Sequence, residues 1–266
     1  MKIGLIADLH CSSLECDIPE RHTTQAPERL KAFLAETEEC DFLLNLGDLI
    51  NGCGDIQLDR DALKSVTDAF DAQPLTVYHA IGNHDLAIPK AELCKALDIP
   101  SGDYSFLRDG VRFIILEANF CEDGITNPES WTVSYLGKRR IDWLEATLAR
   151  DDFKWAVVIT HQCLDELSPN GEKDENSLNH VIDDFSSARR VIRECGKVPL
   201  VLSAHFHQGK MRAIDGTVYF TQPAACIGER VNFGILEIDP ETGRLGVEQH
   251  GIKVTPTLIQ GEANEA

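Results

Sequence analysis

Residues 75–85 constrain the fold of this chain more than any other segment. The first seven, Leu-Thr-Val-Tyr-His-Ala-Ile, are mostly apolar or β-branched, a composition typical of a buried strand. The strand would open into Gly82, Asn83, His84 and Asp85, where three functional side chains follow a glycine that would let the backbone turn. Buried polar groups need partners. We therefore expect these side chains to meet a metal, a substrate or a dense hydrogen-bond network.

Four other predicted strands, at residues 2–7, 41–46, 154–160 and 198–203, also end in polar residues. In chain order these residues are Asp8 and His10, Asp48, His161, and His205 and His207. Alternate residues of a strand point to the same side, so each Asp-x-His or His-x-His pair can reach one ion or two adjacent ions. Ligand sites of open α/β sheets lie at the carboxyl ends of the strands. We expect all of these side chains to gather there.

The rest of the pattern predicts a single α/β domain with two packed sheets, over residues 1–257. Strands and helices alternate at first, and consecutive strands follow. Helices are predicted at residues 27–40, 58–72, 89–97, 137–150 and 186–195, a hairpin at 104–107 and 111–117, and the final strands at 210–214, 217–221, 233–238 and 245–249. Polar loops are expected at 11–25, 119–132 and 165–183, and a frayed tail at 258–266.

Composition excludes several classes of function. The formal charge of −19 leaves no basic track for extended nucleic-acid binding and no polybasic segment for an anionic membrane. The longest apolar runs are too short to cross a bilayer, and the first residues carry no signal-peptide pattern, so the cytoplasm is the expected location. The nine cysteines are scattered without a CxxC pair, which argues against a disulfide framework.

The residue types at the strand ends indicate a transition-metal site. Mixed imidazole and carboxylate ligands suit Mn, Fe, Zn, Ni or Co, whereas Ca and Mg prefer oxygen ligands alone. Seven potential ligands are too many for one tetrahedral zinc and suit two ions that share a bridging carboxylate. Two such ions, roughly 3.5–4 Å apart, can hold a nucleophilic hydroxide and stabilise an in-line displacement at phosphorus.

The order of these motifs resembles the calcineurin-like metallophosphoesterase superfamily. The motifs are Asp8-x-His10, Gly47-Asp48, Gly82-Asn83-His84-Asp85, His161 and His205-x-His207. The resemblance implies an α/β fold of the four-layer α/β/β/α sandwich type, with two packed mixed sheets. Two positions depart from the family pattern: Ala204 stands where glycine is common, and Glu117-Ala118-Asn119 follows a strand where Asp is common.

The same resemblance implies a role for each motif residue. Asp8, His10, Asp48 and His207 would hold one metal, and Asp48, Asn83, His161 and His205 the second, so that Asp48 bridges the two. His84 would face the substrate and neutralise developing charge or protonate the leaving oxygen. Asp85 would accept a hydrogen bond from the other ring nitrogen of His84. The expected cofactors are two divalent or trivalent ions, with Mn, Fe or Zn favoured.

The resulting hypothesis is a dinuclear-metal phosphohydrolase that cleaves phosphodiester or phosphoanhydride bonds by attack of metal-bound hydroxide. A looser resemblance to the cyclic-nucleotide phosphodiesterase and ADP-ribose or CDP-alcohol pyrophosphatase branches places small nucleotide-type substrates first. A phosphomonoesterase is the alternative, and a catalytically silent metallophosphoesterase-like scaffold is the second alternative. The expected partner is a small phosphorylated molecule, and no feature of the sequence indicates an oligomeric state.

Other polar residues near the motifs are expected to be structural or solvated. This group comprises His22, His79, His180, His250, Asn51-Gly52, Arg21, Arg139 and Arg140. A lone histidine is more often a structural residue than a ligand, and a surface arginine is usually solvated. Cys11 and Cys163 are adjacent to motif residues, so either is a candidate for lining the site.

Overall fold

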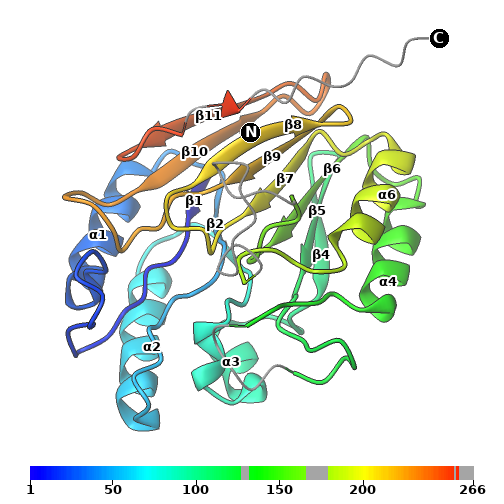
Figure 1. Cartoon of the computed structure of the whole chain (residues 1–266). Helices are drawn as coiled ribbons and strands as arrows, with labels where there is room; N and C mark the ends of the chain where they lie inside the picture. Colours follow the sequence, from blue (N-terminus) through cyan, green and yellow to red (C-terminus); the bar gives the residue numbers. More distant parts are fainter. Residues whose placement is uncertain (127–131, 166–178, 255, 258–266) are drawn as a thin grey trace.

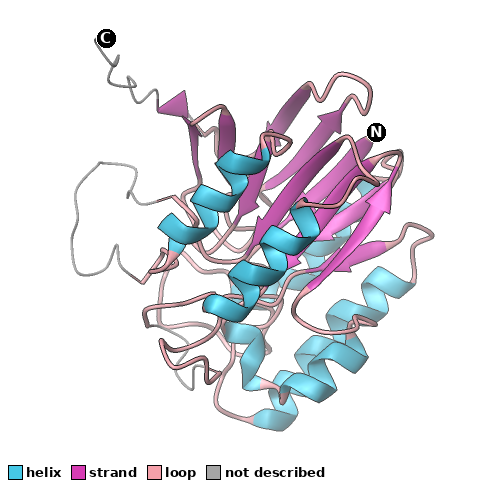
Figure 2. Cartoon of the chain, turned by 90° about the vertical axis from the view of Figure 1, so that its right-hand side faces the viewer, coloured by secondary structure: helices cyan, strands magenta, loops and turns pink. Residues whose placement is uncertain are grey.

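The computed structural model of the chain describes residues 1–126, 132–165, 179–254 and 256–257. Two β-sheets pack face to face, and helices cover the outer face of each sheet (Figures 1 and 2). The predicted four-layer α/β/β/α sandwich is confirmed. The predicted tail at 258–266 and large parts of the predicted loops at 119–132 and 165–183 lie outside the described residues.

The first sheet begins with the N-terminus. Its strands, in spatial order, are β11 (Leu245–His250), β10 (Phe233–Ile238), β1 (Lys2–Ile6), β2 (Phe42–Asn45) and β3 (Val77–His79). Strands β1, β2 and β3 are parallel, so their carboxyl ends share one edge of the sheet. The residues that follow these three strands include Asp8, His10, Asp48 and Asn83.

The second sheet contains the middle of the chain and the hairpin strands. Its strands, in spatial order, are β12 (Pro256–Thr257), β8 (Lys210–Ile214), β9 (Thr217–Thr221), β7 (Leu200–Ser203), β6 (Trp155–Thr160), β5 (Val111–Leu116) and β4 (Tyr104–Arg108). Strands β5, β6, β7 and β9 are parallel. The sequence pattern missed β12, because its two residues are too few to show any periodicity.

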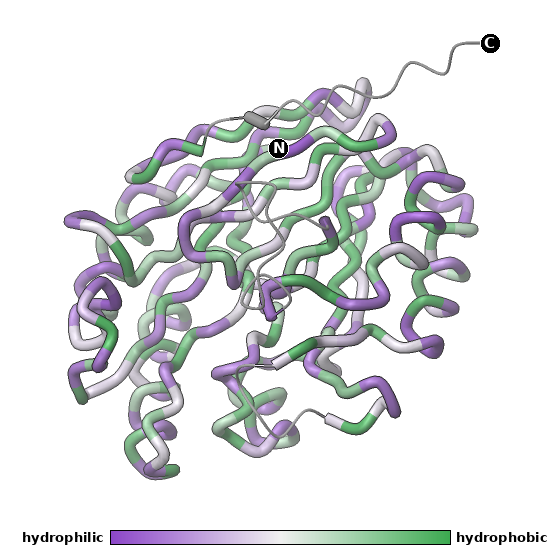
Figure 3. Tube along the Cα trace, in the orientation of Figure 1, coloured by the Kyte–Doolittle hydropathy of each residue, from purple (hydrophilic) through white to green (hydrophobic). Residues whose placement is uncertain are grey.

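Two helical layers complete the sandwich, and hydrophilic and hydrophobic residues alternate along these helices (Figure 3). The helices are α1 (Ala26–Glu36), α2 (Ile56–Asp71), α3 (Lys90–Ala96), α4 (Lys138–Leu148) and α6 (Phe185–Cys195), with single 3₁₀ turns η1 (Thr23–Gln25) and η2 (His84–Ala87). All five predicted helices are present, each within a few residues of its expected bounds.

Three apolar cores separate the four layers. Leu30 and Phe33 of α1 pack with Val66 and Phe70 of α2 against the outer face of the first sheet. A central core between the sheets includes Phe42 of β2 and residues from six other strands. A third core joins α4 and α6 to the second sheet. Burial of these side chains is the main force that holds the strand ends in register.

Strand β3 differs from the buried strand that the sequence predicts. It is only three residues long and forms the edge of the first sheet, so Val77 and Tyr78 are half-buried. Its apolar face packs against β4, the edge of the second sheet, where the Tyr78 and Phe106 rings stack with centroids 3.5 Å apart. The apolar run therefore packs on both faces of the sheet, with Val77 against the outer core and Tyr78 against the core between the sheets, although β3 is an edge strand.

No helix among the described residues is long and apolar enough to cross a membrane.

Candidate metal centre

The carboxyl ends of both sheets meet at one place, and all seven predicted ligands gather there. The first sheet supplies Asp8, His10, Asp48 and Asn83, and the second supplies His161, His205 and His207. Six of the seven are buried, and the side chain of His207 is 21% exposed. Residues nearly 200 positions apart along the chain thus form one cluster.

One half of the cluster contains Asp8, His10, Asp48 and His207. The Nε2 atom of His10 lies 3.3 Å from His207 Nε2, 3.5 Å from Asp48 Oδ2 and 3.9 Å from Asp8 Oδ1. His207 Nε2 lies 3.6 Å from the same Asp8 oxygen. Two ligands of one transition metal, each about 2.1 Å from the ion, are roughly 3 Å apart. The spacing of these four side chains is close to that value.

The other half contains Asp48, Asn83, His161 and His205. The Nε2 atom of His161 lies 3.1 Å from Asn83 Oδ1, 3.2 Å from Asp48 Oδ2 and 3.2 Å from His205 Nδ1. Asp48 Oδ2 therefore lies next to a nitrogen of each half. Among the seven side chains, this oxygen is the one placed to contact two ions.

Each of the two carboxylates has one oxygen fixed by a backbone amide and one oxygen that faces the cluster. The His205 amide donates to Asp8 Oδ2 over 3.1 Å, and the His84 amide donates to Asp48 Oδ1 over 2.8 Å. The other two oxygens, Asp8 Oδ1 and Asp48 Oδ2, are buried, and among the described residues no backbone amide, hydroxyl, lysine or arginine donates a hydrogen bond to either; their neighbours are imidazole nitrogens. Such atoms are costly to bury. The residues present therefore fit a pair of cations.

The imidazole rings of His161 and His205 are oriented by backbone carbonyls. His161 Nδ1 donates to Leu46 O over 2.8 Å, and His205 Nε2 donates to Asn179 O over 3.0 Å. The opposite nitrogen of each ring then faces the cluster, and in a neutral ring it carries the lone pair that a metal ligand requires. Burial lowers the pKa of His205 well below its usual value, which favours the neutral, ligand-competent ring.

The pKa values of His10 and His161 are shifted in opposite directions within the cluster. Burial lowers the pKa of His10 well below its usual value, although Asp48 opposes the effect. Burial also acts to lower the pKa of His161, but Asp48 and Asp8 outweigh it and raise the pKa to about 9. The buried carboxylates thus attract a positive charge, which is a proton in the metal-free protein.

Several residues of the cluster occupy strained backbone conformations. Asp8, His10, Asp48 and His205 have φ values of 51°, 49°, 56° and 66°, in the left-handed region that non-glycine residues rarely adopt. Residues in this conformation are concentrated at functional sites, where the surrounding structure holds them in place. The strain therefore supports a functional role for these strand ends.

Gly82 serves a different purpose from the expected one. Its φ is ordinary, so the backbone does not need glycine in order to turn. A Cβ atom at this position would lie 2.1 Å from Asp48 Oδ1 and 2.3 Å from the Asp48 amide nitrogen. Glycine is required here because the loop after β3 passes directly against the central carboxylate.

The structure contradicts the predicted hydrogen bond between Asp85 and His84. Asp85 Oδ1 accepts from the amides of Leu49 and Ile50, and Oδ2 accepts from those of Asp48 and Gly82, at 2.8–3.3 Å. Burial and Asp48 raise the pKa of Asp85 to about 7, while the amides oppose the shift. Asp85 therefore fixes the backbone of the loop after β2. The prediction was wrong because residues adjacent in the sequence need not contact each other, and the η2 turn points these two side chains in different directions.

His84 is oriented by a carbonyl group instead. Its Nδ1 lies 2.6 Å from the carbonyl oxygen of Asn51, and its ring centroid lies 4.6 Å from that of His10. Donation from Nδ1 leaves Nε2 as the nitrogen available to a bound molecule. His84 is half-buried, as is His207, whereas the other six side chains of the cluster are buried. This is the placement expected of a residue that faces a substrate.

Two further residues close to the cluster escaped the sequence analysis. The Cys226 thiol, in the loop after β9, forms a group with His10 and His207 in which the ligand atoms lie within 4.8 Å of one another. The His180 ring lies 5.4 Å from the His205 ring. Neither residue follows a strand directly, so no local pattern marks it. The expectation that His180 is structural or exposed stays a prediction. Cys163 is buried, and its thiol contacts Ala204 O and Thr221 Oγ1.

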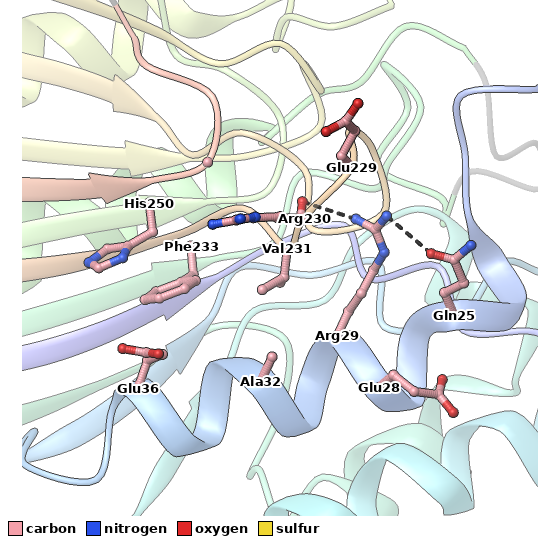
Figure 4. Close-up of a pocket in the computed structure, with 11 residues that line it drawn as sticks. Gln25, Glu28, Arg29, Ala32, Glu36, Glu229, Arg230, Val231, Phe233 and His250 are labelled. Carbon is pink, nitrogen blue, oxygen red and sulfur yellow. Dashed lines mark hydrogen bonds between the residues drawn. The ribbon is translucent and has the colours of Figure 1, made fainter.

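A cavity of about 590 Å³ lies apart from the seven ligands, between α1, β10 and the loop before β10 (Figure 4). Arg29 and Phe233 contribute to its wall. The Arg29 guanidinium donates to the carbonyl oxygens of Ala225, Ile227, Gly228 and Arg230 at 2.6–3.2 Å, and so holds the loop that carries Cys226. The cavity thus borders a loop that is packed against the metal-centre backbone.

Comparison with known proteins identifies the class to which this fold and site belong. The calcineurin-like phosphoesterase family model matches residues 1–209, so the chain belongs to that family. A manganese-dependent ADP-ribose/CDP-alcohol diphosphatase from Arabidopsis thaliana is 23% identical over 60% of this chain and 53% of its own length. The chain therefore spans about half the length of that curated relative.

Solved structures share the fold. A dimetal phosphatase from Danio rerio matches with a TM-score of 0.80 and 17% identity, over 96% of this chain and 97% of that one. A 5′-nucleotidase from Staphylococcus aureus, itself a provisional assignment, matches with a TM-score of 0.60 and 15% identity, over 98% of this chain and 56% of that one. At such identities the likeness establishes the shared architecture.

Proposed function

We propose that this chain is a dinuclear-metal phosphohydrolase that cleaves phosphodiester or phosphoanhydride bonds of small, nucleotide-type substrates. The observation that carries the proposal is the pair of buried carboxylate oxygens, Asp8 Oδ1 and Asp48 Oδ2, which have ring nitrogens of His10, His161 and His207 within 4.0 Å and no lysine or arginine partner in the described part of the chain. Family membership and the manganese-dependent relative support the same conclusion.

In this proposal, Asp8, His10, Asp48 and His207 hold one ion, and Asp48, Asn83, His161 and His205 hold the other. Mixed oxygen and nitrogen ligands favour Mn, Fe or Zn. When bound, two such ions supply a nucleophile at neutral pH and neutralise the charge that develops at phosphorus. The protein's contribution is to fix the ligands through the backbone hydrogen bonds described above.

His84 is proposed to act on the substrate directly. With Nδ1 held by the Asn51 carbonyl, Nε2 of the imidazolium donates a hydrogen bond to a phosphate oxygen or a proton to the leaving oxygen. Asp85 is assigned a positioning role, because its four amide contacts fix the loop that carries Asp48. His84 alone is thus the proposed catalytic side chain.

The substrate class rests on the activity of the Arabidopsis thaliana relative and on charge. That relative is a diphosphatase of ADP-ribose and CDP-alcohols, which are small diphosphate molecules. A net charge of −19 disfavours polymeric nucleic acid as a substrate. A small phosphorylated molecule is therefore the proposed partner. The cytoplasmic location expected from the sequence stays a prediction.

A turnover assay with added Mn²⁺ tests this proposal. The panel contains ADP-ribose and CDP-choline as diphosphates, bis-p-nitrophenyl phosphate as a diester and p-nitrophenyl phosphate as a monoester. We expect hydrolysis of a diphosphate or of the diester to exceed that of the monoester, and EDTA to abolish it. Fastest turnover of the monoester would support a phosphomonoesterase. Inactivity on the whole panel, in protein shown to hold two ions, would support a scaffold without catalysis.

A further inference from the structure

The first loop of the chain brings an arginine beside the metal centre. The segment Arg21 to Thr23 is anchored by backbone hydrogen bonds, from His22 N to Cys226 O over 2.8 Å and from Ser12 N to Thr23 O over 3.3 Å. The Cys226 amide donates in turn to Asp8 O over 3.1 Å. Two hydrogen bonds thus connect this segment to the backbone of a proposed metal ligand, so its position relative to the centre is well defined.

Asn51 holds both the Arg21 and the His84 side chains. The Arg21 Nη1 atom donates to Asn51 Oδ1 over 3.2 Å, while the Asn51 carbonyl oxygen accepts from His84 Nδ1 over 2.6 Å. Arg21 is therefore held next to the proposed substrate-facing histidine, on the side of the centre formed by the loop after β2. The sequence analysis expected a solvated Arg21 and a simple turn at Asn51. Neither expectation includes the Arg21–Asn51 and Asn51–His84 hydrogen bonds.

The Arg21 guanidinium has little of its hydrogen-bonding capacity occupied. Its Nε is buried without a hydrogen-bond partner, and no carboxylate in the described part of the chain forms an ion pair with it. A fixed cation placed in this way is available to an anionic ligand.

We propose that Arg21 binds the second phosphate of a diphosphate substrate, next to the phosphate that is attacked. This inference rests on the proposed function. The two ions neutralise one phosphate, whereas the adjacent phosphate of a diphosphate brings a further negative charge that a single-phosphate ester lacks. A guanidinium fork matches two phosphate oxygens. Arg21 would therefore make the site selective for phosphoanhydrides, with Asn51 as its positioning residue.

Ligand binding by the Mn²⁺-loaded protein tests the inference independently of turnover. The probes are adenosine 5′-(α,β-methylene)diphosphate, whose bridge resists hydrolysis, and AMP, which has one phosphate, both measured by titration calorimetry. We expect the unmodified protein to bind the diphosphate about 10-fold more tightly than AMP, a charge-assisted contact of roughly 1.4 kcal/mol. In Arg21→Ala this preference should fall to about 2-fold or less, with unchanged metal content.

Three further variants sharpen the experiment. Arg21→Lys keeps the charge but loses the planar fork, so an intermediate preference is expected even if the alanine variant folds poorly. Asn51→Ala removes the Oδ1 contact but leaves the carbonyl that holds His84, and should also be intermediate. The matched control is Arg190→Ala, because Arg190 is a half-exposed arginine of α6 that pairs with Glu194, and its loss should leave the preference unchanged.

The outcomes separate this inference from the proposed function. Equal weakening of both probes in Arg21→Ala, no change in either probe, or the absence of a diphosphate preference in the unmodified protein would overturn the role of Arg21. ADP-ribose turnover is measured in parallel on the same samples. The preference for the diphosphate could be lost in Arg21→Ala while the unmodified protein shows no ADP-ribose turnover. That result would support Arg21 as a diphosphate-binding residue and would count against the proposed reaction alone.

Discussion

Two buried polar clusters lie at strand ends of this protein, and they balance their charges differently. The first is the metal centre. The second, here called the β5-end cluster, consists of Glu117 at the end of β5 with Lys90, Asp103 and Arg140. Lys90 pairs with Glu117, and Arg140 pairs with Asp103 at 3.0 Å. Lysine and arginine side chains thus supply the positive charge of the β5-end cluster.

The metal centre has no permanent cation of this kind. In the described part of the chain, neither Asp8 nor Asp48 forms an ion pair with a lysine or arginine, and imidazole rings are the neighbours of their cluster-facing oxygens. Buried carboxylates without compensating charge are expensive. The comparison teaches that a polar strand end indicates a metal site where imidazoles, which are ligands when neutral, surround the carboxylates in place of lysine or arginine.

Asp48→Asn should have the largest effect on metal binding and turnover. The substitution removes the negative charge that both halves of the centre share, so we expect loss of both ions and a fall in turnover of more than about 1,000-fold. Metal content by mass spectrometry is the measurement, with Asp61→Asn on the exposed face of α2 as the matched control. Two ions bound at full occupancy in Asp48→Asn would refute the bridging role.

His84→Ala should have the second largest effect on turnover. Because His84 is proposed to contact the substrate rather than an ion, turnover should fall by roughly 100- to 1,000-fold while both ions remain bound. Paired assays of activity and metal content on one preparation measure the two effects. Release of an ion would show that His84 belongs among the ligands.

Arg140→Met probes the β5-end cluster. The change removes the buried partner of Asp103, which keeps the exposed Arg139 at 3.1 Å, and removes the guanidinium that lies 3.4 Å from the Phe120 ring centroid. We expect a loss of about 2 kcal/mol in the free energy of unfolding, measured by urea denaturation. Metal content and turnover of the folded fraction should be unchanged. A selective loss of metal would break the distinction between the two clusters.

His79 provides a buried histidine outside both clusters. Burial lowers its pKa to about 4 in the folded protein, from 6.5 in the unfolded chain. The unfolded chain then binds the proton more tightly, so this contribution to stability is complete above pH 6.5 and is lost as the pH falls towards 4. Between pH 7.5 and 5, the unmodified protein should lose about 2 kcal/mol more than His79→Gln. Equal losses in the two proteins would show that His79 does not titrate in this way.

The sequence pattern predicted two packed sheets and the gathering of the polar side chains for clear physical reasons, and the family resemblance added the four-layer order. Apolar runs ending in polar residues at several parallel strands lead to one sheet edge, and amphipathic spacing identified α1, α2 and α4. Strand β3 was harder to predict, because an edge strand facing a second sheet has the same apolar composition as a central one.

The contacts around the ligands could not be predicted in the same way. Asp85 points to backbone amides and not to His84, since side-chain direction in η2 depends on local dihedral angles. Cys226 reaches the centre because Arg29 and Asn232 hold its loop there. Arg21 is held beside the centre by its hydrogen bond to the Asn51 side chain. These contacts join distant loops, and neither hydrophobic periodicity nor motif spacing contains information about them.

The most direct test of the central claim is anomalous X-ray diffraction from Mn²⁺-loaded crystals, recorded at the manganese edge. The account predicts two anomalous peaks at the shared edge of the sheets, with Asp48 contacting both ions and His84 contacting neither. A single peak, or two peaks without Asp48 between them, would contradict it.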